Sequence, residues 1–442
     1  MSAAPGRPKQ ARTAGEAEGT PVSAARPPEG ARTAGEAEGL PMSAARPPEG
    51  ARIAGEAEGF PVYAAARTGD AVADIDTPAL VLDLDAMERN IARMAAFARQ
   101  HGVRWRPHAK MHKCAALAQR LVAAGAVGAC VQKTAEAEAL AAAGVQDLYI
   151  SNEVVAPAKL ARVAQLARSL QQRGGRLAIA VDSHEGVDRL AAALAGAQDA
   201  IDVFVEIDVG QGRCGLPPGP EAVQLARRIG AAPQLRFAGL QAYHGKAQHL
   251  RSAEDRRAAM AAVLLLVRDQ LDAFAEAGLA VPLVTGAGTG SMAHEAGSGI
   301  YGELQAGSFL FMDADYAGND TDPAQPVFEH ALFVKSQVIS RNARHAVCDA
   351  GHKSHAIDSG LPLAHRPEGG APWRYANGGD EHGVLHADDG QPLPALGQAV
   401  WLIPGHCDPT VNLHDTLVGV RGGLLQGRVE ELLRVDARGA LA

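Results

Sequence analysis

The amino-acid sequence predicts an α/β protein whose main part is a (β/α)8 barrel followed by a C-terminal β domain. Three observations lead to this prediction. From about residue 74, apolar runs alternate with amphipathic helical segments, the pattern of a parallel sheet covered by helices. Eight such runs precede residue 325, the number that a closed barrel requires. Beyond that point the helical period fades, and short β-rich runs broken by Gly, Pro and Asp replace it.

Composition and charge restrict the class of protein. The 442 residues, 47% of them apolar, can bury at least one large core. The net charge of −8 comes from 42 basic and 50 acidic residues that are mixed along the chain, without a basic run that could follow a nucleic-acid backbone. No apolar stretch approaches the roughly 20 residues of a membrane span, and the N-terminus lacks the apolar core of a secretion signal. The five cysteines are scattered and are expected to be reduced. We therefore expect a cytoplasmic protein that binds neither nucleic acid nor membrane.

Residues 1 to 70 are expected to form a disordered extension. From residue 11 the chain repeats with a period of 20, as in ARTAGEAEGTPVSAARPPEG and ARTAGEAEGLPMSAARPPEG. Repeats often indicate a solenoid, but each unit here has too few sizeable apolar residues to offset the entropy of ordering it. A tethering or partner-binding role stays open. We expect the extension to be dispensable for folding and turnover.

Residues 71 to 325 are expected to form the barrel. The apolar run at 79 to 83 leads into a helix whose start has Asp85 and Glu88 at capping-box spacing. Because this run precedes the eight barrel strands, it is a candidate to pair with the C-terminal domain. The apolar face of the helix carries Met87, Ile91, Met94 and Phe97.

The eight barrel strands are expected near residues 103 to 108, 128 to 132, 147 to 151, 177 to 182, 202 to 209, 236 to 243, 283 to 287 and 303 to 311. Helices between them are clearest at 157 to 173, 219 to 230 and 253 to 278. The C-terminal β domain, residues 326 to 442, is expected to have strands in ALFVKSQVI, HAVCDAG and AVWLIPG.

Lys110 follows the first predicted strand, in VRWRPHAKMHK. Active sites of such barrels lie where the strands end, and a lysine desolvated there can attack an aldehyde. Taken alone, Lys110 could equally be a solvated surface lysine. His108 and His112 could contact the site residues without contacting a ligand.

Arg213 follows the fifth predicted strand, and Tyr243 ends the sixth. The fifth strand contains Glu206 and Asp208, which alternation would turn to the same side, and Arg213 lies in the glycine-rich turn after it. A barrel interior accepts carboxylates only when they are paired with other polar groups. The two acids could therefore be structural residues whose charges are paired inside the barrel. A guanidinium against a pyridine nitrogen would keep that nitrogen unprotonated. Tyr243 could pack on a ring or belong to the core.

The seventh predicted strand ends in TGAGTGS, residues 285 to 291. The glycines, Gly288 and Gly290 among them, allow backbone N–H groups to approach an anion, and Thr289 and Ser291 add hydroxyl donors. Loops at this place in a barrel frequently bind phosphate. A lysine at the first strand and this loop could hold the two ends of pyridoxal phosphate.

His406 and Asp408 lie in the C-terminal segment WLIPGHCDPTVN. If the segment is extended, the two side chains point to the same face and can converge on one ion. Imidazole and carboxylate together suit Mn²⁺ or another fairly hard divalent ion. A turn stabilised by Asp408 is the alternative.

Together these segments resemble the D-threonine aldolase and D-serine dehydratase group, within the alanine racemase-like fold of pyridoxal phosphate enzymes. The resemblance covers roughly residues 74 to 442 and is most specific in DIDTPALVLD, RPHAKMHK, TGAGTGS and PGHCDPTVN. It implies that Lys110 binds the cofactor as a Schiff base, that Arg213 and Tyr243 contact its ring, and that the enzyme is a homodimer. It also implies that His406 and Asp408 bind the metal, since this chain has the His-x-Asp form of the aldolases rather than the His-x-Cys form of the dehydratases.

The resemblance further implies retro-aldol cleavage of D-threonine and related D-3-hydroxy-amino acids to glycine and an aldehyde. Lys110 and His406 are the expected catalytic residues. The base that takes the hydroxyl proton is left open between a metal-bound water and a nearby histidine, of which His382 is one candidate. A D-serine or D-threo-3-hydroxyaspartate dehydratase, an amino-acid racemase and a non-catalytic pyridoxal phosphate-binding protein are the alternatives.

Overall fold

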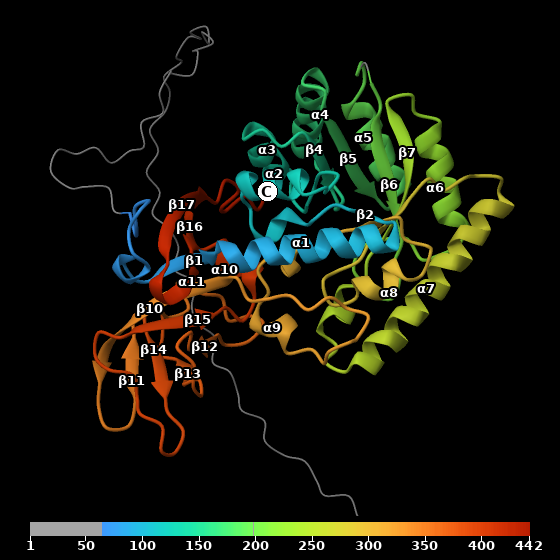
Figure 1. Ribbon diagram of the computed structural model, residues 1–442. Coiled ribbons are helices and arrows are strands. Elements are labelled where there is room, and N and C mark those ends of the chain that lie inside the picture. The colour runs from blue at the N-terminus through green and yellow to red at the C-terminus, as the bar shows by residue number, and fades with distance from the viewer. Residues whose placement is uncertain (1–63, 198) are drawn as a thin grey trace, which may run out of the picture. The chain divides into compact units, whose positions relative to one another are not determined.

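Eight parallel strands form a barrel, as the sequence predicts (Figure 1). The computed structural model describes residues 64–197 and 199–442, and in it the strands run in the order β2-β9-β8-β7-β6-β5-β4-β3. Backbone hydrogen bonds join the two edge strands: Val127 N–H to Trp105 O at 3.0 Å and Cys130 N–H to Pro107 O at 2.9 Å. The strands are β2 (Arg104–Trp105), β3 (Ala129–Val131), β4 (Asp147–Ile150), β5 (Arg176–Val181), β6 (Ile201–Glu206), β7 (Leu235–Ala242), β8 (Val284–Gly286) and β9 (Glu303–Leu304).

Helices cover the outside of this barrel because their apolar faces match those of the strands. Leu160, Val163 and Leu170 of one helix are buried in the same core as Leu148 and Ile150 of β4. The helices are α2 (Ala115–Ala123), α3 (Thr134–Ala142), α4 (Pro157–Gln172), α5 (His184–Ala193), α6 (Pro220–Gly230), α7 (Ala253–Glu276) and α8 (Met292–Ala296). Among the described residues, no helix is both long enough and apolar enough to cross a membrane.

The eighth strand is much shorter than the apolar run from 303 to 311 predicts. β9 ends at Leu304, and the run continues as the 3-10 turn η4 (Ser308–Leu310). Phe309 and Leu310 are buried in the core between the barrel and the C-terminal sheet. A short apolar run does not by itself distinguish a strand from a buried helical turn, so the prediction was wrong here.

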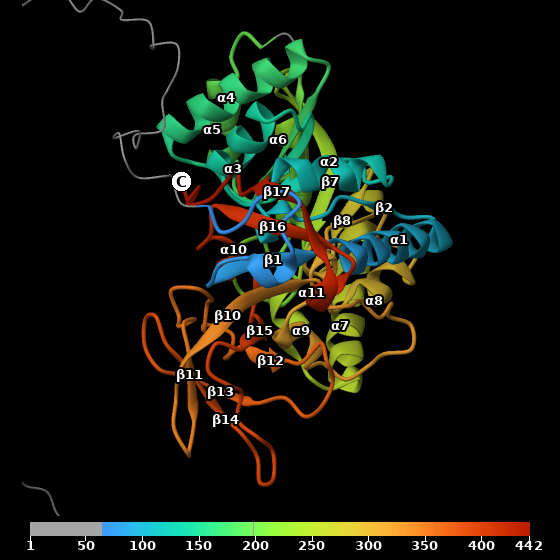
Figure 2. The same ribbon diagram turned by 60° about the vertical axis from the view of Figure 1, so that its left-hand side comes forward.

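A nine-stranded sheet forms the C-terminal part of the fold, in the order β13-β14-β11-β10-β1-β16-β17, with β15 paired to β10 and β12 paired to β15. The early strand β1 (Ala79–Asp83) pairs antiparallel with β10 and parallel with β16, so its predicted pairing with this domain is confirmed (Figure 2). The other strands are β10 (Leu332–Arg341), β11 (Ala346–Cys348), β12 (Leu363–His365), β13 (Arg374–Asn377), β14 (Gly383–His386), β15 (Ala399–Ile403), β16 (Thr416–Arg421) and β17 (Arg428–Arg434).

Helix α1 (Leu84–His101) packs between the barrel and this sheet (Figure 1). Its N-cap is Asp83, whose carboxylate accepts the N–H of Ala86 at 3.1 Å. The predicted capping box was wrong, because Asp85 and Glu88 instead bind the Arg421 guanidinium at 2.9 and 2.8 Å. The predicted apolar face is confirmed, since Met87, Ile91, Met94 and Phe97 are all buried.

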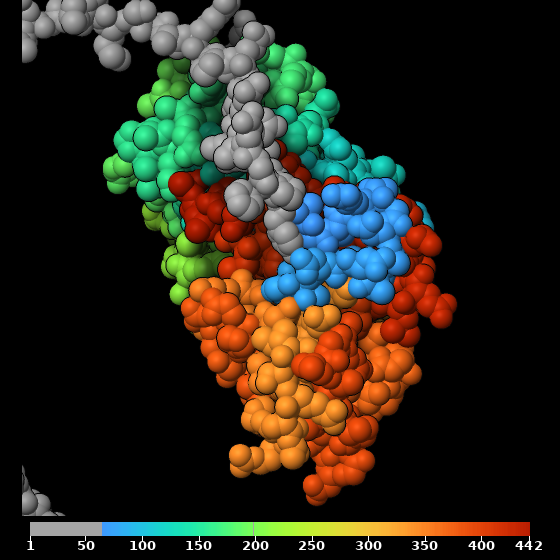
Figure 3. Space-filling view, turned by 90° about the vertical axis from the view of Figure 1, so that its left-hand side faces the viewer, coloured from blue at the N-terminus to red at the C-terminus, as the bar shows by residue number. Residues whose placement is uncertain are grey.

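The residues just before position 71 pack against the sheet. Ala66 is 4% exposed, Gly69 N–H donates to Val429 O at 2.8 Å, and Asp76 N–H donates to Ala65 O at 2.8 Å. In Figure 3 the first described residues, in blue, lie against the red and orange C-terminal region. Residues 1–63, which hold most of the repeat region, lie outside the described residues.

We expect a chain that begins at Tyr63 to keep the unfolding temperature and turnover of the full chain. A chain that begins at Ala71 should unfold at a lower temperature by several degrees, because it lacks the Gly69 to Val429 hydrogen bond and the buried Ala66. Thermal unfolding of the three chains checks this. Loss of activity on removing residues 1 to 62 would contradict it.

Candidate active site

A cavity of about 420 Å³ opens at the carboxyl ends of the barrel strands, where barrel active sites are expected. Six of the predicted site residues line it: Lys110, Arg213, Tyr243, Gly288, Thr289 and Asp408. Gly290 and His406 are not among its lining residues. Most of the predicted residues, which are far apart in the sequence, therefore meet at one place.

Lys110 lies on the 3-10 turn η2 (Ala109–Met111), which follows β2. The turn is capped by His108, whose Nδ1 accepts the N–H of Lys110 at 3.4 Å. The Lys110 ammonium group lies 2.8 Å from Oδ2 of Asp408. The negative charge of Asp408 raises the pKa of Lys110 above its ordinary value, although burial acts in the opposite direction. The lysine of the first strand and the carboxylate of the C-terminal motif thus form an ion pair.

The two histidines beside Lys110 are held as neutral rings. Burial lowers the pKa of His108 well below its ordinary value, and it lowers that of His112 to about 4. His108 Nε2 lies 3.1 Å from the Gln132 amide nitrogen, and His112 Nδ1 accepts the N–H of Cys114 at 3.0 Å. These contacts fix the loop that carries Lys110.

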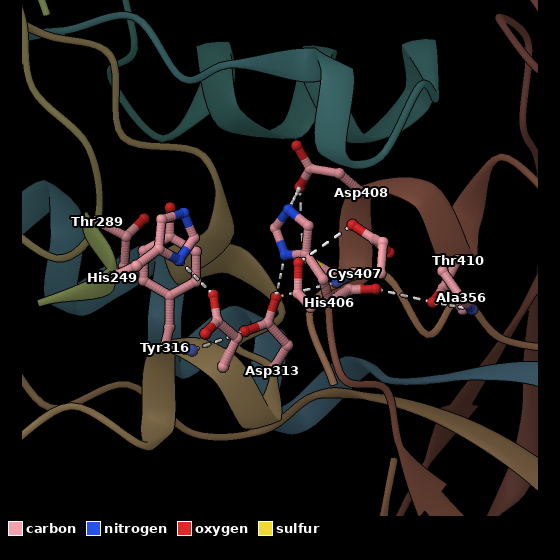
Figure 4. A network of polar contacts seen from close by, with 12 residues as sticks. His249, Thr289, Asp313, Tyr316, Ala356, His406, Cys407, Asp408 and Thr410 are labelled. Atoms are coloured by element: carbon pink, nitrogen blue, oxygen red, sulfur yellow. Dashed lines mark hydrogen bonds and ion pairs between the residues drawn. The ribbon is translucent and has the colours of Figure 1, made fainter. Parts of the chain in front are cut away.

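His406 and Asp408 converge, although their segment is not extended. His406 is the N-cap of helix α10 (Cys407–Val411), and Asp408 lies in its first turn. His406 Nε2 is 3.7 Å from Asp408 Oδ1, and His406 Nδ1 is 2.7 Å from Asp313 Oδ2 (Figure 4). Asp313 is wholly buried at the start of α9 (Ala314–Ala317). Because Asp313 engages Nδ1, Nε2 is the nitrogen left to bind an ion beside Asp408.

The charges of Lys110, His406 and Asp408 shift one another's pKa values. Burial opposes a charged His406, but the Asp313 hydrogen bond and the Asp408 charge outweigh it and raise the pKa of His406 to about 9. Burial likewise opposes an ionised Asp408, but Lys110 and His406 hold the pKa of its carboxyl below the ordinary value. Lys110 and His406 thus both favour the carboxylate form of Asp408.

Asp313, His406 and Cys407 also bring potential ligand atoms within 4.8 Å of one another. Asp313 Oδ2, however, already accepts hydrogen bonds from the His406 ring at 2.7 Å and from the Cys407 N–H at 2.9 Å. Burial raises the pKa of the Cys407 thiol well above its ordinary value, and a protonated thiol is a poor metal ligand. We therefore assign Asp313 the role of orienting His406.

Arg213 lies over the ring of Tyr243 in the cavity. The guanidinium carbon is 5.7 Å from the Tyr243 ring centroid, and Nη2 is 3.9 Å from Glu206 Oε1. Asp208 does not share a face with Glu206 as the alternation predicts. Beyond the end of β6, its carboxylate instead accepts the N–H groups of Gly210 and Gly212 at 3.0 Å and so holds the turn that carries Arg213.

Glu206 is a buried carboxyl beside a second carboxyl. Burial, followed by the charge of Glu153, raises the pKa of Glu206 to about 9. In the unfolded chain the group would ionise near its ordinary value of 4.5. Between these two values only the unfolded state loses the proton, so rising pH favours unfolding.

We expect Glu206→Gln, a neutral isostere, to stabilise the protein at pH 8 by about 2–4 kcal/mol and to leave its stability unchanged below pH 4.5. The free energy of unfolding of the variant and of the wild type, measured at both pH values, shows whether the substitution stabilises the protein. A loss of stability at pH 8 would contradict the assignment, because it would mean that ionised Glu206 stabilises the fold through Arg213.

The glycine-rich loop after β8 is held by hydrogen bonds to Gln248 and Phe309. Gly290 N–H donates to Gln248 Oε1 at 2.8 Å, and Ser291 Oγ accepts from Gln248 Nε2 at 2.8 Å. Thr289 Oγ1 accepts the N–H of Phe309 at 3.0 Å. A Cβ at Gly288 would lie 2.4 Å from Gln248 Oε1, so a larger residue here would displace the Gln248 amide that holds the loop. The cavity is thus reached by Gly288 and Thr289 rather than by the whole loop.

Several residues of the site were missed by the sequence analysis. Asp313, Tyr316 and His249 lie in or beside the cavity, but none belongs to a motif that could have indicated it. His382, considered as a base, is exposed in the turn between β13 and β14 and does not line the cavity.

Known proteins are similar to this chain over most of its length. The family "Alanine racemase, N-terminal domain" matches residues 82–315, and "Putative serine dehydratase domain" matches residues 331–420. A D-threonine aldolase from Arthrobacter sp. is 44% identical over 375 residues, which are 85% of this chain and 96% of that protein. A 3-hydroxy-D-aspartate aldolase from Paracoccus denitrificans (strain Pd 1222) is 43% identical over 376 residues, with 83% and 93% covered.

A more distant relative and a solved structure complete the comparison. D-threo-3-hydroxyaspartate dehydratase from Delftia sp. (strain HT23) is 31% identical over 366 residues, which are 77% of this chain and 93% of that protein. The crystal structure of D-threonine aldolase from Filomicrobium marinum has a TM-score of 0.81 and 46% identity, with 86% of this chain and 100% of that chain covered.

Proposed function

The chain belongs to the D-threonine aldolase and D-serine dehydratase group of alanine racemase-like enzymes, and we propose that it cleaves D-threonine and related D-3-hydroxy-amino acids to glycine and an aldehyde. Its more similar relatives are two kinds of aldolase, both lyases, and the dehydratase is more distant. The reaction breaks the bond between Cα and Cβ.

The residues of the cavity fit pyridoxal phosphate. Lys110, 41% exposed to the cavity, would carry its aldehyde carbon. Arg213 and Tyr243 would contact its ring, and Gly288 and Thr289 would contact its phosphate. When bound, the cofactor supplies a ring that takes up the electron pair left at Cα as the bond to Cβ breaks.

His406 and Asp408 fit a divalent metal ion. Their Nε2 and Oδ1 atoms are 3.7 Å apart, and the other ring nitrogen of His406 is engaged by Asp313. We propose Mn²⁺, because a nitrogen and a carboxylate oxygen form a mixed and fairly hard ligand set. When bound, the ion lowers the pKa of the hydroxyl on the substrate's β-carbon.

Asp408 connects the two halves of the site. As a free amine, Lys110 would hold a proton at Nζ beside the Asp408 carboxylate, 2.8 Å away. His406 would lie on the side of the site that receives the substrate's β-hydroxyl, and Asp313 fixes the orientation of its ring. Overall, the bond between Cα and Cβ breaks, the hydroxyl oxygen becomes the aldehyde oxygen, and the proton that the hydroxyl gives up is balanced by the proton that Cα takes to give glycine.

The observation that carries this proposal is the 2.8 Å contact between Lys110 and Asp408. It brings the amine that would hold the cofactor to the group that would hold the metal. Purified protein should convert D-threonine to glycine and acetaldehyde, and D-threo-3-hydroxyaspartate to glycine and glyoxylate, but should leave L-threonine unchanged. Chromatography of the products decides.

Dehydration is the second candidate, because one relative is a dehydratase. That reaction would expel the hydroxyl after loss of the Cα proton, and it would give 2-oxobutanoate from D-threonine and oxaloacetate from the hydroxyaspartate. Asp408, where the dehydratases of the resemblance have cysteine, favours the aldolase. Detection of these oxo acids without glycine would reverse the assignment.

We further propose that the enzyme is a cytoplasmic homodimer. All five cysteines are unpaired, as expected of a reducing compartment. The dimer is expected from the fold family, and light scattering of the purified protein tests it.

Replacing Asp313 by Asn should weaken metal binding by about 10- to 100-fold. Asp313 is wholly buried and its carboxylate fixes the His406 ring through Nδ1, so the amide would permit other ring orientations. Titration of metal-free protein with Mn²⁺, followed by electron paramagnetic resonance, measures the affinity. Asp388→Asn, at an exposed position beyond β14, is the control. Unchanged affinity in the Asp313 variant would contradict the orienting role.

A further inference from the structure

The 3-10 turn η3 (Gly245–His249) places two basic side chains on one wall of the cavity. Lys246 and His249 are three residues apart, and in a 3-10 turn residues at this spacing lie on the same side. Both line the cavity that contains Lys110 and Asp408. This wall follows β7, directly after Tyr243.

His249 is held in a fixed orientation by a buried carboxylate. Its Nδ1 lies 2.7 Å from Asp315 Oδ2, and the Asp315 side chain is 4% exposed. Arg251 also binds Asp315, from the side away from the ring. Because the Nδ1–H of His249 donates to Asp315, Nε2 can donate to an anion only in the imidazolium form, in which both ring nitrogens carry a proton.

The short helix α9 thus supports two histidines of the cavity region. Asp313 binds Nδ1 of His406, and Asp315 binds Nδ1 of His249, each at 2.7 Å. The Tyr316 ring is near both histidines, with centroid distances of 6.1 Å to His249 and 6.2 Å to His406 (Figure 4). His249 and Tyr316 both line the cavity.

The charges that line the cavity are unequal. Three lysine or arginine side chains, Lys110, Arg213 and Lys246, and one aspartate, Asp408, line the cavity. Lys110 pairs with Asp408, and Arg213 lies over the Tyr243 ring. Within residues 64–442, position 198 apart, no carboxylate lies within 4.0 Å of the Lys246 ammonium group. The cavity thus has an unassigned cation beside an oriented imidazole.

We propose that Lys246 and His249 form an oxyanion subsite that receives the carboxylate on the β-carbon of the substrate. This rests on the proposed function and deepens it: the preferred substrates are then D-3-hydroxy-amino acids with a second carboxylate, such as 3-hydroxy-D-aspartate, rather than D-threonine. The comparisons do not decide this point, because relatives of both kinds are equally similar, at 44% and 43% identity.

The test compares D-aspartate with D-2-aminobutyrate, which differ in a carboxylate or a methyl group at the β-carbon. Neither has the hydroxyl that retro-aldol cleavage needs, so binding to the full-length holoenzyme is measured without turnover, from the absorbance of the bound cofactor. Divalent ions are removed by chelation so that the second carboxylate cannot bind a metal instead. Failure of cleavage, tested separately on D-threonine, therefore does not affect the result.

We expect the wild type to bind D-aspartate about 10-fold more tightly than D-2-aminobutyrate, as one charge-assisted contact provides. Lys246→Met should reduce this ratio to about 2, and His249→Gln should reduce it in part. Lys159→Met, on α4 and outside the cavity, should leave it at about 10. The cofactor absorbance of each variant reports that it is folded and loaded.

Three results would overturn the assignment. Equal binding of the two ligands by the wild type would show that no subsite recognises the second carboxylate. A loss of affinity for both ligands alike in Lys246→Met would assign the cation to the α-carboxylate. Weaker binding of pyridoxal phosphate by the variant, with the ratio unchanged, would assign it to the cofactor phosphate.

Discussion

The Lys110→Ala variant is expected to lose C–C cleavage by roughly 10³-fold or more, because no other amine replaces the covalent attachment of the cofactor aldehyde. Among the residues that line the cavity, the other lysine is Lys246, which follows β7 rather than β2. The fold should be kept, since Lys110 is partly exposed and its turn is capped by the His108 side chain. Asp408 would lose its closest cation.

Borohydride reduction followed by peptide mapping identifies the attachment directly. The wild type should carry the pyridoxyl group on the peptide that contains Lys110, and the variant should carry none. Lys159→Ala is a suitable control, because Lys159 lies on α4 outside the cavity. A pyridoxyl group on Lys246 in the wild type would mean that the wrong wall of the barrel was assigned to the cofactor.

The barrel strands could be predicted from the sequence because each is a short apolar run between turn residues and helices. This signal is local, as in Leu148 to Ile150 of β4. The start of α1 could not be predicted correctly by the same means. Asp83, Asp85 and Glu88 all have cap-forming side chains, and the choice of Asp83 depends on Arg421, which engages the other two from β16.

The candidate site could be predicted only in part for the same reason. Lys110 and Asp408 belong to recognisable segments, whereas the partner of His406 does not. Asp313 reaches His406 because α9 is joined to the segment before α10, through hydrogen bonds from Ala314 N–H to Pro404 O and from Asp315 N–H to Gly405 O, both at 3.0 Å. A contact made by tertiary packing leaves no local pattern in the sequence.

Removal of the divalent ion is expected to stop C–C cleavage while the absorbance of the bound cofactor stays largely unchanged. Lys110 and the Gly288 to Thr289 loop would hold the cofactor on the barrel, and His406 and Asp408 would hold the ion on α10. The two groups therefore use different elements, and only Asp408 touches both. Added Mn²⁺ should restore turnover, and product analysis before and after chelation measures it.

Asp408→Ala should behave like the chelated wild type but should not be rescued by Mn²⁺. It also removes the negative charge that raises the pKa of Lys110, so the lysine amine should titrate at a lower pH in the variant. His406→Ala separates the two effects, since it removes a proposed metal ligand and keeps the Asp408 contact with Lys110. Both variants should lose cleavage by roughly 10²-fold or more.

Asp408→Cys is the most informative change, because it recreates the His-x-Cys ligand pair. A thiolate is a softer ligand than a carboxylate, so metal preference should shift from Mn²⁺ toward Zn²⁺. Competition between the two ions for metal-free protein, measured as relative affinity in the wild type and the variant, checks the direction. Because Asp313 still fixes His406 through Nδ1, the change is confined to one ligand. If metal-free wild type cleaved D-threonine at the untreated rate, the metal role of His406 and Asp408 would be excluded, and the racemase-like alternatives would have to account for the chemistry.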